Sequence, residues 1–204
     1  MFSVYPNLNL RKLREVCALS LLVIAYGLST ACVWAQIESG QDLVRSHAVE
    51  IISDEVTIDG ILDEAVWTST ATIGDLIQRE PKTGQAPSER TEVYLLRDTN
   101  HLYVGIEAYD SEPDKMVGSN MTRDASTRSQ DTLQIILDTF HDQRNAYYFA
   151  TNPSGSLIDG LVYGNQNLNT DWNTIWDMRV KRTDQGWTME VAIPFKSLNF
   201  PEGE

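Results

Sequence analysis

The residues that most resemble a catalytic site lie in the stretch IDGILDEAVW, residues 58–67, where Asp63 and Glu64 precede Trp67. A glycosidase needs two carboxyl groups roughly 5–10 Å apart on either side of a sugar. Neighbouring residues of a helix project in different directions, so these two carboxyl groups do not face each other. Acidic residues near a helix start also interact favourably with the helix dipole. We therefore predict a scaffold element, anchored in the core by Trp67, and no catalytic residue.

Two further tryptophans, Trp172 and Trp176, stand four residues apart in the polar stretch TDWNTIWDM, residues 170–178. Flat aromatic rings stack on the C–H faces of sugars, and burying one removes roughly 150–250 Å² from water. One interpretation is a sugar platform, with Asp171 and Asn173 binding hydroxyl groups. The other is structural, with Trp176 packed in the core and Trp172 covering an edge.

The segment MTRDASTRSQD, residues 121–131, is long, polar and rich in charged side chains. Loops of this kind on a rigid scaffold often carry function. Because charged side chains make strong hydrogen bonds, Arg123, Asp124, Arg128 and Asp131 are candidates for binding hydroxyl groups or a carboxylate. The alternative is a solvated loop with surface ion pairs.

A metal site is suggested by Asp138 and Asp142 in the stretch DTFHDQRN. Calcium takes six to eight oxygen ligands, and these carboxylates could supply some of them. No D-x-D-x-D-G loop is present, so an acidic surface turn is the alternative. Motifs of metalloproteases, serine hydrolases and phosphate-binding loops are also missing from the sequence.

The elements that would position these residues are strands. Apolar residues alternate with polar ones in several short runs, separated by turns such as Asp98-Thr99-Asn100 and Asp184-Gln185-Gly186. This spacing indicates an all-β fold, an antiparallel, jelly-roll-like β-sandwich. One short helix is expected around residues 62–67. The strongest predicted strands are residues 91–97, 102–109, 131–138, 145–151 and 187–193.

The N-terminal residues have the features of a secretory signal peptide. Basic residues at 11, 12 and 14 precede an apolar run of roughly 13 residues, and Val33-Trp34-Ala35 resembles a cleavage site. The run is shorter than the ~20 residues that span a bilayer. We predict cleavage after Ala35, a flexible lead-in over residues 36–48 and one domain over residues 49–204. A lipoprotein signal with Cys32 acylated is the alternative.

The charge and cysteine content of the chain limit the classes of molecule that it can bind. The chain without residues 1–35 has 13 basic and 28 acidic residues, a net charge of −15, and no cysteine. Nucleic acids and anionic lipids need a basic patch, so they are poor candidates. A cysteine-free, acidic, exported chain fits the bacterial periplasm or the outer-membrane surface.

The final residues, FPEGE, have the character of a connection, so we expect a sandwich truncated at its C-terminus; a frayed natural tail is the alternative.

Four stretches in order carry a family resemblance: IDGILDEAVW, TEVYLLRDTNHLYVGIEAYD, DTLQIILDT and GWTMEVAIPFKSL. Over roughly residues 49–201 the chain resembles the carbohydrate-binding module family nine. It is similar in particular to the version at the N-terminus of bacterial outer-membrane β-barrel proteins. The resemblance implies a β-sandwich in which the D-E-x-x-W segment is structural.

The resemblance also implies a sugar clamp of two tryptophans, with acid, amide and arginine groups on the hydroxyls. Arg128 stands where the first tryptophan is expected, and Gln134 stands where an acid is expected. Glutamine can still form paired hydrogen bonds. The second tryptophan would come from beyond Glu204. The clamp is therefore not visible in this sequence.

The sequence is compatible with two functions. The first is non-catalytic glycan binding linked to polysaccharide breakdown. The second is a structural domain that docks on an outer-membrane barrel and no longer binds sugar. A hydrolase is disfavoured because no suitably placed pair of carboxyl groups is evident.

Overall fold

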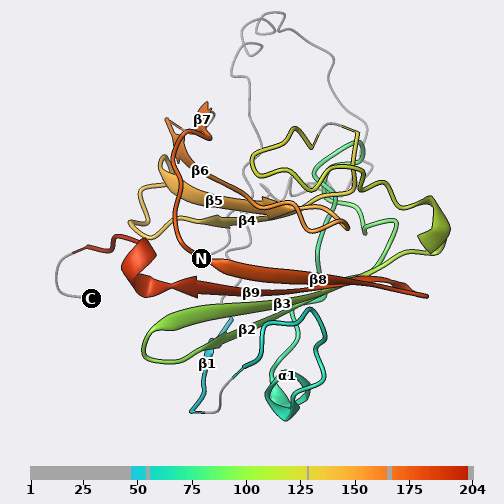
Figure 1. Cartoon of the computed structure of the whole chain (residues 1–204), viewed down its shortest axis with the longest axis horizontal. Helices are drawn as coiled ribbons and strands as arrows, with labels where there is room; N and C mark the ends of the chain where they lie inside the picture. Colours follow the sequence, from blue (N-terminus) through green and yellow to red (C-terminus); the bar gives the residue numbers. More distant parts are fainter. Residues whose placement is uncertain (1–46, 54–55, 128, 165–166, 202–204) are drawn as a thin grey trace, which may run out of the picture. The chain divides into compact units, whose positions relative to one another are not determined.

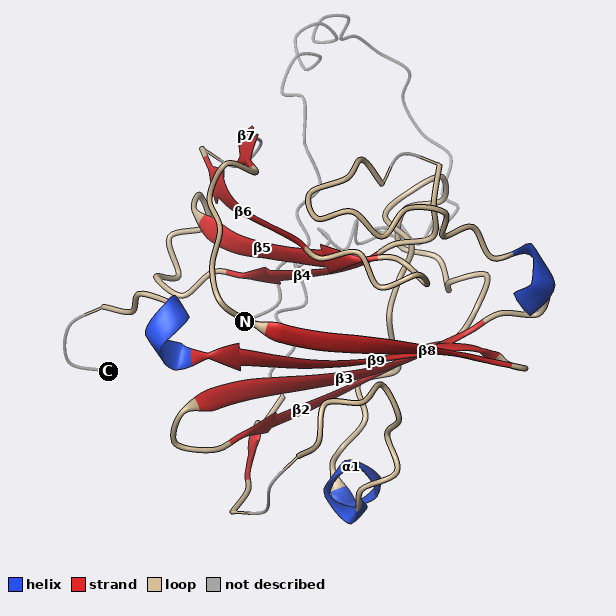
Figure 2. Cartoon of the chain, viewed as in Figure 1, coloured by secondary structure: helices blue, strands red, loops and turns tan. Residues whose placement is uncertain are grey.

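The computed structural model describes residues 47–53, 56–127, 129–164 and 167–201. The predicted signal peptide, most of the predicted lead-in and Arg128 lie outside these residues. The described residues form two β-sheets, shown in Figures 1 and 2. The five-stranded sheet has the order β1-β2-β3-β9-β8, and the four-stranded sheet has the order β4-β5-β6-β7.

The strands of the five-stranded sheet are β1 (Glu50–Ile51), β2 (Thr91–Arg97), β3 (His101–Tyr109), β8 (Asp177–Thr183) and β9 (Gly186–Pro194). Those of the four-stranded sheet are β4 (Leu133–Leu137), β5 (Ala146–Thr151), β6 (Ile158–Tyr163) and β7 (Asn167–Asn169). The described helices are α1 (Ala65–Ser69) and two 3₁₀ turns, η1 (Pro113–Lys115) and η2 (Phe195–Ser197). All strand pairs are antiparallel except β1 with β2, which is parallel.

The main core lies between the two sheets. Alternate residues of each strand point inward, as the period-two pattern predicted. Val104, Val191 and Ile193 of the five-stranded sheet meet Ile135 and Phe149 of the four-stranded sheet in one buried cluster. The predicted all-β sandwich is therefore confirmed, with the parallel β1–β2 pair as the one departure from an antiparallel arrangement in the described residues.

A second apolar cluster covers the outer side of the five-stranded sheet. Trp67 of α1 is 1% exposed and packs with Leu96 and Tyr103. Its ring lies so close to Gly105 that a Cβ there would come within 3.0 Å of Trp67 Cζ3. The helix begins at Ala65, slightly later than predicted, and Trp67 is its buried anchor as predicted. Among the described residues, no helix is long and apolar enough to cross a membrane.

Candidate functional site

The 121–131 loop is held by a buried carboxylate of β6. Asp159 is fully buried, and Arg123 Nη2 donates to its Oδ1 at 2.5 Å. The Arg123 side chain itself is 41% exposed. Close by, the backbone N–H of Asp124 donates to Leu157 O at 2.9 Å. The loop is therefore fixed at the start of β6, with one arginine reaching from solvent to a buried acid.

The same carboxylate fixes the segment between β7 and β8. Thr174 N donates to Asp159 Oδ2 at 2.6 Å. Arg123 Nε donates to Asn173 Oδ1 at 2.9 Å, and Arg123 Nη2 also reaches Thr174 O at 3.3 Å. We call Arg123, Asp159, Asn173 and Thr174 the Arg123 cluster. It brings together two predicted site residues, Arg123 and Asn173, that lie 50 positions apart in the sequence.

Trp172 stands next to Asn173 and is partly buried. Its ring centroid lies 5.3 Å from that of Tyr147 and 6.5 Å from that of Phe149. One part of the indole therefore packs on the inner side of β5, and the remainder is open to solvent. Asp171 is exposed beside it, and its N–H donates to Asn169 Oδ1 at 2.9 Å.

Trp176 has a different environment, and its inclusion among the predicted sugar-binding residues needs correction. It is 8% exposed and packs edge to face on Phe149, with ring centroids 5.1 Å apart. A buried ring offers no face to a sugar, so Trp176 is a core residue in this structure. The structural alternative describes Trp176 correctly and Trp172 in part.

The remaining predicted residues lie elsewhere. Gln134 is exposed on the outer side of β4, paired in register with Ala150 of β5. Asp131 accepts the N–H of Val117 at 2.7 Å through its carboxylate, and its own N–H donates to Val117 O at 3.0 Å. These two bonds close the base of the 121–131 loop, which gives Asp131 a structural role. Arg128 lies outside the described residues.

The proposed calcium ligands belong to the β4–β5 turn. The Asp138 carboxylate accepts the backbone N–H groups of Phe140, Asp142 and Gln143. The Asp142 carboxylate accepts those of Arg144 and Asn145, and these bonds lower its pKa. Within the described residues, no three His, Cys, Asp or Glu side chains gather as a metal site. The carboxylates match turn capping better than a preformed calcium site, and calcium binding stays a prediction.

Sequence reasoning missed Asp159, the residue that organises the Arg123 cluster. The sequence does indicate that Asp159 is unusual, because it is the one charged residue in the strand IDGLVY. Asp159 is paired in register with Phe149 of β5, and period-two alternation places it on the same face of β6 as Leu161. A buried acid in a strand normally has a partner. The sequence could therefore have indicated a pair, although not which arginine completes it.

Two β-sheets enclose the core, and the Arg123 cluster lies next in sequence to the partly exposed Trp172. The family model described as "Carbohydrate family 9 binding domain-like" matches residues 58–203. The chain therefore belongs to this family, as the resemblance implied. No curated protein matches the chain.

The chain is also similar to solved structures. A family 9 module from Caldicellulosiruptor kristjanssonii, in complexes with cellotriose and with glucose, is 20% identical, with a TM-score of 0.49. The match covers 72% of this chain and 66% of that one, just under two thirds of its length. A proposed carbohydrate-binding protein from Bacteroides uniformis has a TM-score of 0.54 at 11% identity, over 73% of this chain and 72% of that chain. At this identity the match to the Bacteroides uniformis structure shows the fold alone.

Proposed function

We propose that this chain is a non-catalytic glycan-binding domain. The observation that carries the proposal is the family match over residues 58–203. The Arg123 cluster and Trp172 supply the binding surface in this proposal. Asp159 holds the guanidinium in place, Asn173 is exposed, and Trp172 presents part of its ring. Fixed planar donors beside an aromatic surface suit the hydroxyls and C–H faces of a pyranose.

A glycan-array screen followed by calorimetry tests this function, with glucose and cellotriose included as probes. We expect Trp172→Ala to lower the affinity by tenfold or more, because it removes the aromatic contact surface, whereas Trp172→Phe should keep part of it. Ile77→Ala is the control, since Ile77 is an exposed apolar residue on a different segment. Binding that is unchanged in folded Trp172→Ala would exclude this surface.

Two finer proposals concern the natural setting. Export to the periplasm or the outer-membrane surface follows from the signal-like residues 1–35. It is tested by mass spectrometry of the protein expressed in bacteria, and the mature chain should begin at Gln36. A link to polysaccharide breakdown would require a separate catalytic partner, so the purified chain should release no reducing sugar from glycans that it binds.

The second candidate function is docking on an outer-membrane barrel, which rests on the family resemblance and on the absence of the expected tryptophan at Arg128. A folded chain that binds no glycan on the array favours it.

Calcium binding is proposed for the Asp138–Asp142 turn and is tested by thermal unfolding with calcium or with a chelator. A calcium-dependent rise in Tm that disappears in Asp138→Asn would support the site, and an unchanged Tm would oppose it.

A further inference from the structure

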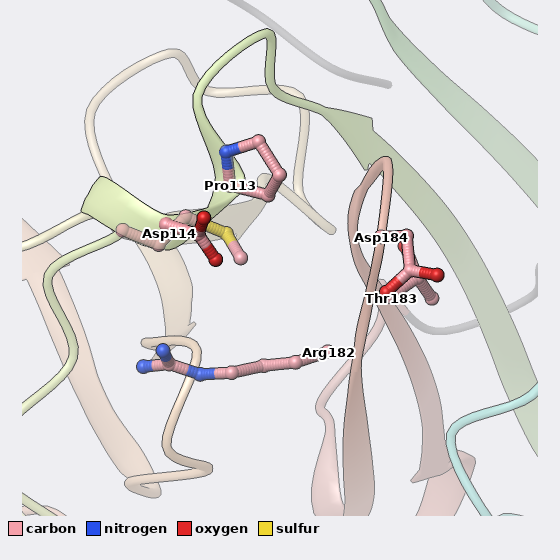
Figure 3. A pocket seen from close by; sticks show the side chains of 6 residues that line it. Pro113, Asp114, Arg182, Thr183 and Asp184 are labelled. Carbon is pink, nitrogen blue, oxygen red and sulfur yellow. The ribbon is translucent and has the colours of Figure 1, made fainter.

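A polar pocket lies away from the Arg123 cluster, between η1 and the β8–β9 hairpin. It has a volume of about 400 Å³, and its lining residues are Pro113, Asp114, Met116, Arg182, Thr183 and Asp184 (Figure 3). Pockets that hold small ligands typically start near 300 Å³. The lining combines two apolar side chains with three charged ones. The space is therefore suited to a small ligand that has both apolar and hydrogen-bonding surfaces.

Arg182 is held in place without an ionic partner. Its Nε donates to Pro153 O at 3.1 Å, and its Nη2 donates to Gly118 O at 3.4 Å. Within the described part of the chain, no carboxylate lies within ion-pair distance of its guanidinium. The backbone contacts thus orient the guanidinium while Nη1 keeps its hydrogen-bonding capacity.

The two acids at the pocket also lack partners. In the described residues, neither Asp114 nor Asp184 takes part in a hydrogen bond or an ion pair through its carboxylate. Figure 3 shows the guanidinium of Arg182 and the side chain of Asp114 on neighbouring sides of the pocket, with Asp184 at the hairpin turn. Exposed donors and acceptors of opposite charge therefore border the pocket, and no ion pair joins them in the described residues.

This combination selects among ligand classes. The lining carries two aspartates and one arginine, a net charge of −1, so an anion is disfavoured. A small cation could use the aspartates alone and would leave Arg182 without a role. A neutral sugar uses both kinds of group, because each hydroxyl can donate to a carboxylate and accept from a guanidinium. Pro113 provides apolar surface for its C–H groups, whereas Met116 is only 9% exposed and packs mainly with Trp187. The chemistry thus favours a neutral polyhydroxylated ligand.

We propose that the Arg182 pocket is a second saccharide contact, sized for a single sugar unit and separate from the Arg123 cluster. The inference rests on the proposed function, because it assigns the pocket to the same ligand class. Two separate contacts on one domain would let it engage two units of one polysaccharide and raise its avidity for long chains over single sugars.

The test is amide NMR of the full chain titrated with glucose, galactose, mannose and cellotriose. We expect shifts at Thr183 and Asp184 with at least one sugar, and about tenfold weaker binding at these amides in Asp114→Asn. This variant keeps the side-chain shape and removes no contact of the described structure. Lys115→Ala is the matched control, because Lys115 lies in the same 3₁₀ turn and does not line the pocket.

The outcomes separate the two proposals. Shifts confined to Trp172 and Asn173 overturn the pocket and leave the proposed function standing. Shifts at Thr183 and Asp184 that Asp114→Asn weakens support the pocket even if Trp172→Ala has no effect on them. Shifts there that are equal in Asp114→Asn and the parent chain, or no shift with any of the four sugars, overturn the pocket.

Discussion

The indole N–H of Trp67 donates to Oε1 of Glu190 at 3.0 Å, and this bond joins the N-terminal helix to the central part of β9. Glu190 is fully buried. Its other oxygen accepts the backbone N–H groups of Asp59 at 2.9 Å and Gly60 at 2.8 Å. One carboxylate therefore fixes both ends of the stretch 58–67. The tryptophan of the D-E-x-x-W segment therefore has a structural hydrogen-bond partner, Glu190.

Replacing Glu190 with glutamine should destabilise the fold. All three partners of the carboxylate are hydrogen-bond donors. The NH₂ group of glutamine is also a donor, so at least one of the three would lose its acceptor. We expect a loss of about 1–3 kcal/mol in the free energy of unfolding, the cost of an unsatisfied buried group. Urea denaturation measures it, with the exposed Glu112→Gln as control. A loss no larger than that of Glu112→Gln would contradict this role.

The contribution of Glu190 should depend on pH. Burial raises the pKa of Glu190 above its ordinary value, and the three donors offset this only in part. For an acid whose folded pKa is raised, the stabilisation is complete below the unfolded pKa of about 4.3 and is lost as the pH rises through the folded pKa. The stability advantage of the parent chain over Glu190→Gln should therefore shrink as the pH rises above about 4.3. An advantage that grows over this range would show that the donors outweigh burial.

Alanine at position 105 should disturb the outer cluster. A Cβ there would lie 2.8 Å from Leu62 Cδ2 and 3.0 Å from Trp67 Cζ3, inside normal contact distance. Overpacking of this kind costs about 1–3 kcal/mol. Gly74→Ala is a matched control, because its new Cβ would meet only Glu92 Cγ, at 3.9 Å. Thermal unfolding of the two variants should give a lower Tm for Gly105→Ala alone. Equal Tm values would mean that the helix can move away at little cost.

Removal of Arg123 should cost more than removal of a surface charge. Arg123→Ala leaves the buried Asp159 with Thr174 N as its remaining donor among the described contacts. A fully buried pair loses about 3–5 kcal/mol on such a change, and because Arg123 is partly exposed we expect about 2–3 kcal/mol. The double variant with Asp159→Asn should lose less than the sum of the single changes. Additive losses in urea denaturation would show that the two side chains are not coupled.

Local pattern was sufficient for much of the fold. The alternation in residues 187–193 and 91–97 predicted β9 and β2, because a strand with one buried face imposes a two-residue period. Trp67 could be assigned to the core because adjacent acids on a helix cannot face each other. Residues 123 and 173 stood out because charged and amide groups in polar segments are available for binding.

The sequence by itself determined which segments become strands, which turns separate them and which family they belong to. Only the tertiary structure decided that Asp159 pairs with Arg123, that Glu190 accepts three donors from the 58–67 stretch, and that Trp176 is buried whereas Trp172 is partly open. The physical reason is the separation along the chain of the residues involved. Alternation is a property of neighbours along the chain, whereas each of these contacts joins residues brought together when the strands pair and the two sheets close on each other.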